Sequence, residues 1–498
     1  MDRTNVGRTA QLTTRRATTS LRERAAEVLW ANWTGTSTVP SRQLYPHQWS
    51  WDSAFIAIGL RHLSPLRAQL ELETLLSAQW GDGRVPHIVF NPAVPLDAYF
   101  PSPDFWRSTT AGRTAGAPGA IHTSGIVQPP VHALAVWLVH RADPGLSRAR
   151  SFLARAHPRL AAWHRYLRCR RDAGGAGLAS VIHPWEQGMD NSPCWDAPLR
   201  RVPPADPSAY RRADLDHGAA EDRPTDLDYG RYVRLAADYR DRGYADGGGA
   251  DGGGDEHAGG VGEFAVEDPS FNALLIASEH ALARIEAELD LRDASVVRET
   301  RARALTGTLV ERLWDPADGL FLCRDLRSGD HREPPSGELV PERGVGGLVP
   351  LILPALPAPV AAALVRTACG PHFGLGGPAR LVPSYDLTGS AFDPRRYWRG
   401  PAWFNTNWLL ERGLRLHGEP TRAAGLRRAL LEVAGESGFA EYVDPYTGRG
   451  CGARGFGWSA ALALDLLLDD PAGRDEEPHG RPAEAPSVAV TRKRFRDD

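Results

Sequence analysis

Apolar residues recur at spacings of three and four along most of the chain, a periodicity that is typical of amphipathic helices. Because Pro158 lies inside one such segment, we expect a kink or a division there. The clearest strand candidate is Leu320–Arg324. Strands and helices do not alternate regularly, which argues against a Rossmann fold or a β/α barrel. The pattern predicts twelve helical segments, which are Arg22–Trp33, Asp52–Leu63, Pro65–Gln79, Val131–Arg141, Ser147–Arg168, Asp226–Arg240, Ser270–Leu289, Ala294–Trp314, Pro359–Cys369, Trp403–Leu416, Thr421–Val433 and Phe456–Leu468.

Three stretches lack this periodicity and mark the limits of the folded domain. Residues 1–18 are polar, residues 243–262 are rich in Gly and Asp, and residues 470–498 are rich in Pro, Glu and Arg. Such compositions cannot bury a core, so we expect these stretches to be disordered. The remaining sequence predicts a single domain over residues 19–469, with a disordered insertion near 243–262.

The predicted helices show no repeat of fixed period, so a closed toroid of helices is favoured over an open solenoid. Long loops separate some of the helices, at residues 90–126, 181–222 and 371–399. Loops of this length in a compact domain usually carry function. We therefore expect an all-α fold, a toroid with long loops over one mouth.

The charge balance excludes some classes of partner. The chain has 61 acidic and 58 basic residues and a formal net charge of −3, whereas nucleic-acid binding is usually accompanied by a strong basic excess. The first twenty residues contain no apolar stretch like that of a signal peptide. Prolines interrupt the uncharged run at 344–365, which argues against one spanning helix. We expect a cytoplasmic protein that binds neither nucleic acid nor membranes.

Tryptophan is abundant, with 15 residues, and much of it lies close to carboxylates. Indole rings can stack on the apolar C–H faces of a sugar, and carboxylates accept hydrogen bonds from its hydroxyls. This combination indicates a carbohydrate site. The segments concerned are LYPHQWSWDSAF at 44–55, HPWEQGMDNSPCWD at 183–196, RRYWRGPAWFNTNWLL at 395–410 and FAEYVDPYTGRG at 439–450.

Separated acids and aromatic platforms are the parts that glycoside hydrolysis needs. Asp190 lies between Trp185 and Trp195, and such surroundings can desolvate a carboxyl group and raise its pKa. Nucleophile elbows, phosphate-binding loops, zinc-protease motifs and Rossmann glycine motifs are missing from the sequence, so we expect no metal and no cofactor. A structural interpretation stays open for each acid: Asp52 as a helix cap, Asp190 as a turn residue and Glu441 as a surface residue.

Four motifs resemble those of glycoside hydrolase family 63, and most closely its bacterial members that cleave mannosylglycerate and glucosylglycerate. They are PHQWSWDSAF, EQGMDNSPCWD, YWRGPAWFNTNW and a late AEY followed by GWSAAL. The resemblance runs from about Trp30 to Leu468. It implies an (α/α)6 barrel with loops closing over the active-site mouth, and an inverting mechanism. It makes Asp190 the general acid and Glu441 the general base, with their carboxyl groups roughly 6.5–9.5 Å apart.

The resemblance also implies which residues bind the substrate. In the similar enzymes an Arg, followed six residues later by a Tyr, serves the glycerate end, and RPTDLDY supplies Arg223 and Tyr229 at this spacing. A guanidinium can bind a carboxylate through two hydrogen bonds. Tyr99 is a further candidate, while a surface arginine paired with Asp222 or Asp226 is the alternative interpretation of Arg223. Around the sugar, the resemblance places Tyr45, Trp49, Trp51, Asp52, Gln128, Tyr397, Trp398 and Trp403.

The expected function is that of an inverting α-glycosidase for a small anionic glycoside, glucosylglycerate first and mannosylglycerate second. The expected partner is this small-molecule substrate, and the sequence leaves open whether the chain forms a homo-oligomer. Two alternatives stay open: a trehalase-like or other α-glucosidase for neutral sugars, and a carbohydrate-binding helical toroid without catalytic activity.

Overall fold

The computed structural model describes residues 20–216, 220–246, 262–328 and 337–469. The chain divides into two compact units, residues 1–467 and 468–498. The expected disorder of 1–18 and 470–498 falls outside the described residues, and so does most of the Gly- and Asp-rich insertion. The elements and the cavity described below all belong to the first unit, apart from the last residue of α17.

Each of the twelve predicted segments contains a helix, with ends that differ by a few residues from the prediction. The first helix spans 20–31. The helices that follow are α2 (Ser50–Leu60), α3 (Pro65–Ser77), α6 (His132–Ala142), α7 (Pro144–Ala149), α8 (Phe152–Arg170), α11 (Asp226–Asp241), α12 (Pro269–Glu288), α13 (Arg292–Leu313), α14 (Ala358–Cys369), α15 (Phe404–Leu416), α16 (Pro420–Ser437) and α17 (Gly457–Leu468). Short helices α4 (Pro103–Trp106), α5 (Ser108–Ala111), α9 (Pro184–Gln187) and α10 (Asp196–Leu199) lie in the long loops.

The division of the segment around Pro158 is found at a different residue from the predicted one. The helix α8 continues through Pro158, and the break lies at Ser151, whose φ is +52°. A left-handed backbone at Ser151 turns the chain between α7 and α8 and leaves Pro158 within the second helix. The proline therefore does not end the helix, because packing of the surrounding turns outweighs the hydrogen bond that it removes.

Outer helices alternate along the chain with inner segments within the part that the structure describes. All eleven residues of α2 are buried, whereas only four of the 22 residues of α13 are buried. The outer helices are 20–31, α3, α8, α13, α14 and α16. The inner segments are α2, α6, α12, the 3₁₀ turns η5 (Val345–Gly347) and η6 (Val349–Ile352), α15 and α17.

The inner segments form a closed ring. Successive members pack against each other from α2 through α6, α12 and η6 to α15. The helix α17 then joins both ends, because Asp465 accepts a hydrogen bond from Trp408 of α15 (2.9 Å) and pairs with Arg61, which caps α2 (2.6 Å). At this seam a Cβ on Gly59 would collide with the backbone of Ala461. Glycine thus lets the first and last inner helices approach closely.

Within the described ranges, the strands are two residues long and pair antiparallel in four small sheets. The predicted strand Leu320–Arg324 is two strands, β6 (Leu320–Phe321) and β7 (Arg324–Asp325). The sheets have the orders β1-β2, β11-β10-β9, β3-β4-β7-β8 and β5-β6. Their other strands are β1 (Gln48–Trp49), β2 (Ile88–Val89), β3 (Ser180–Val181), β4 (Val266–Glu267), β5 (Trp314–Asp315), β8 (Glu338–Leu339), β9 (Ala402–Trp403), β10 (Tyr442–Val443) and β11 (Gly450–Cys451).

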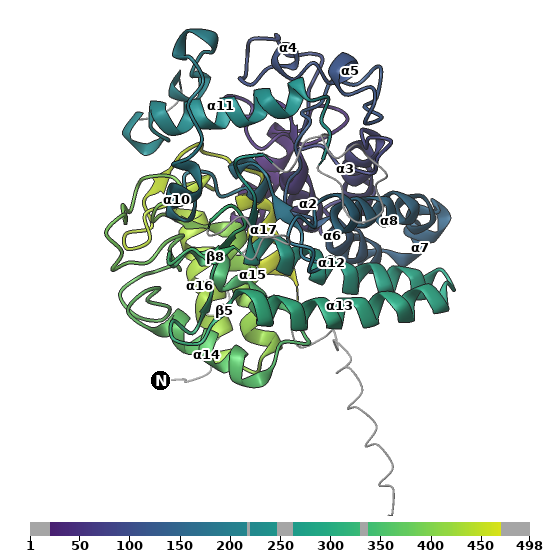
Figure 1. Ribbon diagram of the computed structural model, residues 1–498. Coiled ribbons are helices and arrows are strands. Elements are labelled where there is room, and N and C mark those ends of the chain that lie inside the picture. Colours follow the sequence, from purple (N-terminus) through teal and green to yellow (C-terminus); the bar gives the residue numbers. More distant parts are fainter. Residues whose placement is uncertain (1–19, 217–219, 247–261, 329–336, 470–498) are drawn as a thin grey trace, which may run out of the picture. The chain divides into compact units, whose positions relative to one another are not determined.

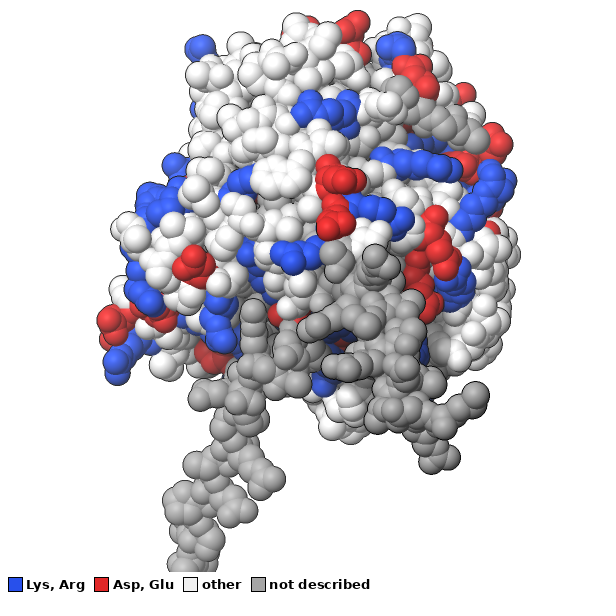
Figure 2. Space-filling model, turned by 180° about the vertical axis from the view of Figure 1, so that it is seen from behind, with Lys and Arg blue, Asp and Glu red and all other residues white. Residues whose placement is uncertain are grey.

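Two further observations bear on possible partners. On the face shown in Figure 2, basic and acidic side chains are interspersed rather than gathered by sign. None of the helices in the described ranges is both long and apolar enough to cross a membrane.

At the opposite end of the view from α14, Figure 1 shows α4, α5 and α11 together. The loops next to these helices line the cavity described below.

Candidate active site

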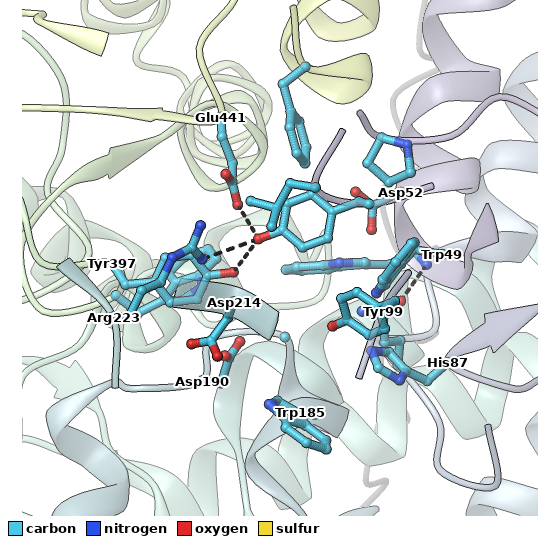
Figure 3. A pocket seen from close by; sticks show the side chains of 18 of the residues that line it. Trp49, Asp52, His87, Tyr99, Trp185, Asp190, Asp214, Arg223, Tyr397 and Glu441 are labelled. Carbon is cyan, nitrogen blue, oxygen red and sulfur yellow. Dashed lines mark hydrogen bonds between the residues drawn. The ribbon is translucent and has the colours of Figure 1, made fainter. Parts of the chain in front are cut away.

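One cavity collects all thirteen predicted site residues. The space between these residues measures about 810 Å³, a volume that includes solvent at the open mouth. Figure 3 shows the carboxylates of Glu441, Asp52 and Asp190 around this space, with Arg223 and Tyr397 on one side. The predicted residues that line it are Tyr45, Trp49, Trp51, Asp52, Tyr99, Gln128, Asp190, Arg223, Tyr229, Tyr397, Trp398, Trp403 and Glu441.

Asp190 faces the cavity from the loop that follows α9. The turn into this loop is made by Gly188, whose φ is +79° and where a Cβ would lie 2.6 Å from the ring of Trp51. Enclosure by the protein raises the pKa of Asp190 to about 7, and the negative charges of Glu441 and Asp214 also raise it, against the opposing effect of Arg223. This carboxyl group can therefore hold a proton near neutral pH, as a general acid must.

Glu441 lies directly before β10 and is almost completely buried, so its interpretation as a surface residue is wrong. Burial raises its pKa above the ordinary value, while Arg223 and several hydrogen bonds lower it. The Tyr45 hydroxyl donates to Oε1 (2.9 Å) and the Ala453 N–H donates to Oε2 (2.9 Å). Donors of this kind favour the ionised form, which is the form that a general base needs.

Asp52 does not cap a helix. The helix α2 begins at Ser50, with Trp49 as its N-cap, because Trp49 is still held in the extended strand β1. Asp52 therefore lies in the first turn, where its side chain is buried against the cavity. Burial and the nearby charge of Glu441 raise its pKa well above the ordinary value. Its oxygens line the cavity and can accept hydrogen bonds from a ligand.

Arg223 is buried, with 6% of its surface exposed, so its interpretation as a surface residue paired with Asp222 or Asp226 is wrong. Asp226 pairs instead with Arg212 (2.8 Å). The Nη1 of Arg223 donates to Tyr45 (3.3 Å), and the guanidinium lies 5.0 Å above the ring of Tyr397. Its remaining donors leave it able to bind an anion in the cavity.

Small strands position the aromatic wall. Trp403 of β9 pairs in register with Tyr442 of β10, which places Glu441 next to this wall. The rings of Trp398 and Trp403 stack with their centroids 3.8 Å apart. On the other side of the cavity, Trp49 of β1 contacts the edge of Tyr99, with centroids 5.1 Å apart. The strands thus hold aromatic rings in the wall of the cavity.

Gln128 and Tyr229 also contribute to the framework of the cavity. The Gln128 side-chain oxygen accepts a hydrogen bond from the backbone N–H of Trp51 (3.1 Å), so it connects its loop to the start of α2. Tyr229 lies in the first turn of α11 and donates to the backbone oxygen of Phe100 (3.3 Å). It therefore connects the start of α11 to the long loop at 90–126.

Ten lining residues were not among the predicted site residues. Several of them lie inside the motif segments, where tryptophan and glycine gave a signal that could have included them. Asp214 lies outside those segments, and its sequence RRADLD looks like an ordinary solvated stretch of charged residues. The ten residues are Pro40, Leu44, His87, Phe100, Trp185, Gly188, Asp214, Pro224, Phe456 and Trp458.

A buried ion pair supports the loop that carries Asp190. Glu186 of α9 is fully buried and binds Arg171 through both oxygens (2.7 and 2.9 Å). The same carboxylate accepts hydrogen bonds from the backbone N–H groups of Val127 (3.3 Å) and Ile182 (2.9 Å). Because Val127 precedes Gln128, Glu186 holds two site loops in one place.

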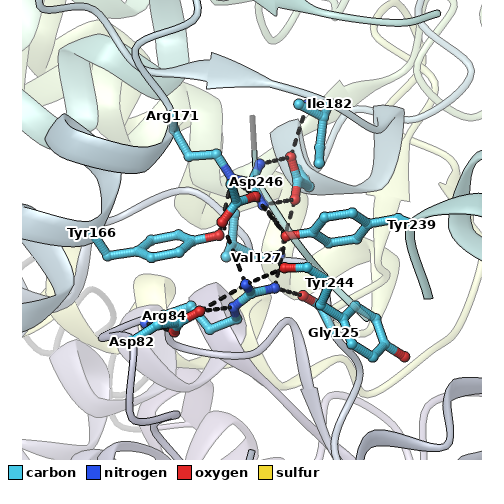
Figure 4. A network of polar contacts seen from close by, with 11 residues as sticks. Asp82, Arg84, Gly125, Val127, Tyr166, Arg171, Ile182, Tyr239, Tyr244 and Asp246 are labelled. Atoms are coloured by element: carbon cyan, nitrogen blue, oxygen red, sulfur yellow. Dashed lines mark hydrogen bonds and ion pairs between the residues drawn. The ribbon is translucent and has the colours of Figure 1, made fainter. Parts of the chain in front are cut away.

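The network extends into the segment that was predicted to be disordered. Asp246 lies between two buried guanidiniums, pairing with Arg171 (3.0 Å) and Arg84 (3.4 Å), and accepts a hydrogen bond from Tyr239 (2.6 Å) (Figure 4). Tyr244 is completely buried. The expectation of disorder is therefore wrong for residues 243–246, since ion pairing and aromatic packing fix them, while residues 247–261 lie outside the described part.

Comparison with known proteins identifies the family of this chain. Residues 45–459 match the model of the mannosylglycerate hydrolase MGH1-like glycoside hydrolase domain. The chain is 41% identical over 448 residues to a mannosylglycerate hydrolase of Rubrobacter radiotolerans, covering 89% of this chain and 96% of that protein. It is 38% identical over 468 residues to a glucosylglycerate hydrolase of Mycolicibacterium hassiacum, covering 90% and 98%.

A solved structure shows the same fold. The family 63 mannosylglycerate hydrolase of Thermus thermophilus, in complex with Tris and D-glycerate, superposes with a TM-score of 0.77 at 38% identity, covering 89% of this chain and 99% of that one. The protein is thus a glycoside hydrolase with the helical fold of family 63. Within that class it belongs to the mannosylglycerate hydrolase MGH1-like family.

Proposed function

We propose that this chain hydrolyses the α-glycosidic bond of a small anionic glycoside, most readily glucosylglycerate and also mannosylglycerate, with inversion at the anomeric carbon. The observation that carries the proposal is the buried Arg223, which brings a positive charge into a cavity lined mainly by aromatic rings and carboxylates. A glycoside with a carboxylate at its leaving-group end would neutralise that charge. The names of the relatives support the same substrate class.

In the proposed reaction, Asp190 donates its proton to the glycosidic oxygen as the bond to the anomeric carbon breaks. A water molecule attacks the opposite face of that carbon and gives a proton to Glu441. The products are the free sugar and glycerate, and the proton returns from Glu441 to Asp190 through solvent. The raised pKa of Asp190 supports its role as the acid, and the donors around Glu441 support its role as the base.

The substrate is tested with α-glucosyl and α-mannosyl glycerates, while NMR resolves the anomer that is released first. We expect hydrolysis of both glycosides, with the β-anomer of the sugar appearing first. Release of the α-anomer would contradict the inverting mechanism, and absence of turnover with both would contradict the substrate class.

The role of Arg223 is tested with a neutral aglycone. We expect Arg223→Ala to lower kcat/KM for glucosylglycerate by about 100-fold or more, because a charge-assisted pair is lost. For glucosylglycerol or trehalose, which lack the carboxylate, the change should be within about threefold. Arg395→Ala is the matched control, since it removes an exposed guanidinium from the loop before Tyr397. Equal losses on charged and neutral substrates would favour an α-glucosidase for neutral sugars.

A further inference from the structure

A third carboxylate faces the cavity close to Asp190. Asp214 lies in a short 3₁₀ helix, η3 (Ala213–Asp216), within a long loop, and its side chain is 17% exposed. Arg212 binds both of its oxygens, at 2.9 Å from Nε and 2.6 Å from Nη2. This bidentate pair leaves further acceptor positions on each oxygen, since an ionised carboxylate can accept about four hydrogen bonds.

Arg212 fixes Asp214 relative to the residues proposed to bind the charged end of the substrate. Its guanidinium stacks 4.2 Å above the ring of Tyr229 and donates to the backbone oxygen of Pro224 (3.0 Å), the neighbour of Arg223. The segment that carries Asp214 and the segment that carries Arg223 and Tyr229 are therefore joined by one side chain. Asp214 is part of a built site rather than a carboxylate that swings freely in solvent.

The electrostatic influence of Asp214 falls on the leaving-group side of the cavity. Its charge raises the pKa values of Asp190, Tyr99 and Tyr229. The charge of Glu441 raises the pKa values of Asp190 and Tyr99 as well as that of Asp52, whereas the charge of Asp214 is not among the causes for Asp52. Figure 3 shows the same division, with Asp214 next to Asp190 and Asp52 on the opposite side of the cavity. A group that contacts Asp214 would therefore belong to the aglycone and not to the sugar.

An ionised carboxylate accepts hydrogen bonds and repels other anions, so Asp214 cannot receive the carboxylate of the substrate. We infer that Asp214 is a specificity-determining residue that accepts a hydrogen bond from a free hydroxyl of the aglycone, while Arg223 takes its carboxylate. Together they select a hydroxy acid that keeps a second hydroxyl after glycosylation, as glycerate does, over lactate, which has none left. This inference rests on the proposed function.

The experiment compares two glycosides that differ in this hydroxyl alone, α-glucosyl glycerate and α-glucosyl lactate, each at the pH optimum of the variant tested. We expect the unmodified protein to prefer the glycerate glycoside by about 10- to 100-fold in kcat/KM, because the lactate glycoside leaves the Asp214 acceptors unpaired. Asp214→Ala should lower kcat/KM for the glycerate glycoside by a similar factor and should change that for the lactate glycoside by less than about threefold.

Two variants keep the result interpretable if Asp214→Ala disturbs the loop. Asp214→Asn keeps the shape and one acceptor oxygen, so we expect an intermediate preference for the glycerate glycoside. Asp226→Asn removes the other carboxylate that pairs with Arg212. The side chain of Asp226 is 84% exposed and does not line the cavity. This control should keep the full preference of the unmodified protein.

The outcomes separate this inference from the proposed function. Equal losses on both glycosides in the Asp214 variants would overturn the inference, since Asp214 would then only hold the loop or tune Asp190. Equal activity of the unmodified protein on both glycosides would overturn it as well. If the unmodified protein cleaves neither glycoside, the proposed function itself fails, and the inference fails with it.

Discussion

Asp190 and Glu441 are both enclosed by protein, yet their hydrogen-bond environments differ in a way that divides their roles. The pKa of both is raised by burial, and Glu441 alone has Tyr45 and the Ala453 backbone donating to its two oxygens. Two carboxyl groups with different environments can thus hold different protonation states at one pH. The acid and base assignments are therefore decided by the immediate surroundings of single side chains.

The pH dependence of kcat/KM should follow from these two groups. Asp190 must be protonated, so activity should be retained below its pKa of about 7 and lost as the pH rises through it. Glu441 must be ionised, and because its pKa is raised, the acidic limb should lie above the ordinary value of a glutamate. A pH–rate profile measures both limbs. A basic limb below pH ~5 would contradict the assignment of Asp190.

Removal of either carboxyl group should stop turnover without unfolding the protein. We expect Asp190→Asn and Glu441→Gln each to lower kcat by about 10²- to 10⁴-fold, the range typical of a positioned acid or base. Circular dichroism and thermal unfolding serve as the check on folding, and Asp226→Asn serves as a surface control. Retained turnover in either variant would contradict the role proposed for that carboxyl group.

The sequence predicted most of the site residues, and the reason is chemical. Tryptophan beside carboxylates is an unusual combination, so Trp49, Trp51, Asp52 and Asp190 stand out in the chain. Asp214 does not, because an aspartate among arginines is common on surfaces and only the folded loop brings it to the cavity. The role expected of each residue came from the resemblance to family 63, because residue patterns alone do not assign such roles.

Among the elements, the site depends on loops that are fixed by buried charge rather than by regular secondary structure. Glu186, Arg171, Arg84 and Asp246 come from four separate segments and are all nearly or fully buried. Each ion alone would be costly to bury, and the network stabilises them because every charge has partners. This network holds the loops that carry Gln128 and Asp190 in place.

Asp246→Asn tests this dependence. Loss of the charge between two buried guanidiniums should lower the free energy of unfolding by about 3–5 kcal/mol. We also expect kcat to fall by about tenfold with little change in KM, because displacement of Glu186 would misplace the general acid. Thermal unfolding and steady-state kinetics at 25 °C measure the two effects.

Asp241→Asn is the matched control for this variant, since Asp241 also pairs with arginine near the end of α11 but is 54% exposed. Its unfolding free energy should change by about 1 kcal/mol or less. A loss of stability in Asp246→Asn with unchanged kcat would show that the network is structural and does not position the acid.

Helical periodicity predicted the elements well because apolar residues recur at spacings of three and four over three or more turns. It could not predict the break at Ser151, because serine is not a residue type that marks a left-handed backbone, yet Ser151 adopts one and turns the chain. Nor did it show that the fourth inner position is taken by the 3₁₀ turns η5 and η6 instead of an α-helix. Such features depend on contacts between segments that lie far apart in sequence.

At the scale of the whole ring, the inner segments close where α17 meets α2. Gly59 makes this approach possible, and the buried pair of Arg61 with Asp465 lies at the same seam. The lack of a fixed repeat favoured a closed toroid over an open solenoid, and the resemblance to family 63 implied the same closure, but neither could show which contacts close the ring. The seam is therefore the feature on which the entire ring depends.

Gly59→Ala should open this seam. An added Cβ would meet the backbone of Ala461, which cannot move aside as a flexible side chain could, so we expect a loss of about 3 kcal/mol or more in the free energy of unfolding. Gly307→Ala is the matched control, because Gly307 lies on the exposed side of α13 with open space around it. That change should stabilise the protein by about 0.5–1 kcal/mol. Chemical denaturation measures both, and equal stabilities would contradict the role of the seam.

The hydrogen bond between Tyr45 and Glu441 joins residues that are 396 positions apart. During synthesis the chain leaves the ribosome at about 5–20 residues per second, so the segments of Tyr45 and Asp190 emerge tens of seconds before Glu441 exists. An incomplete chain would therefore lack the proposed base. The proposed site can therefore be complete only after the last inner helix has been synthesised and has packed against the first. Hydrolytic activity would then indicate that both translation and folding of the domain are finished.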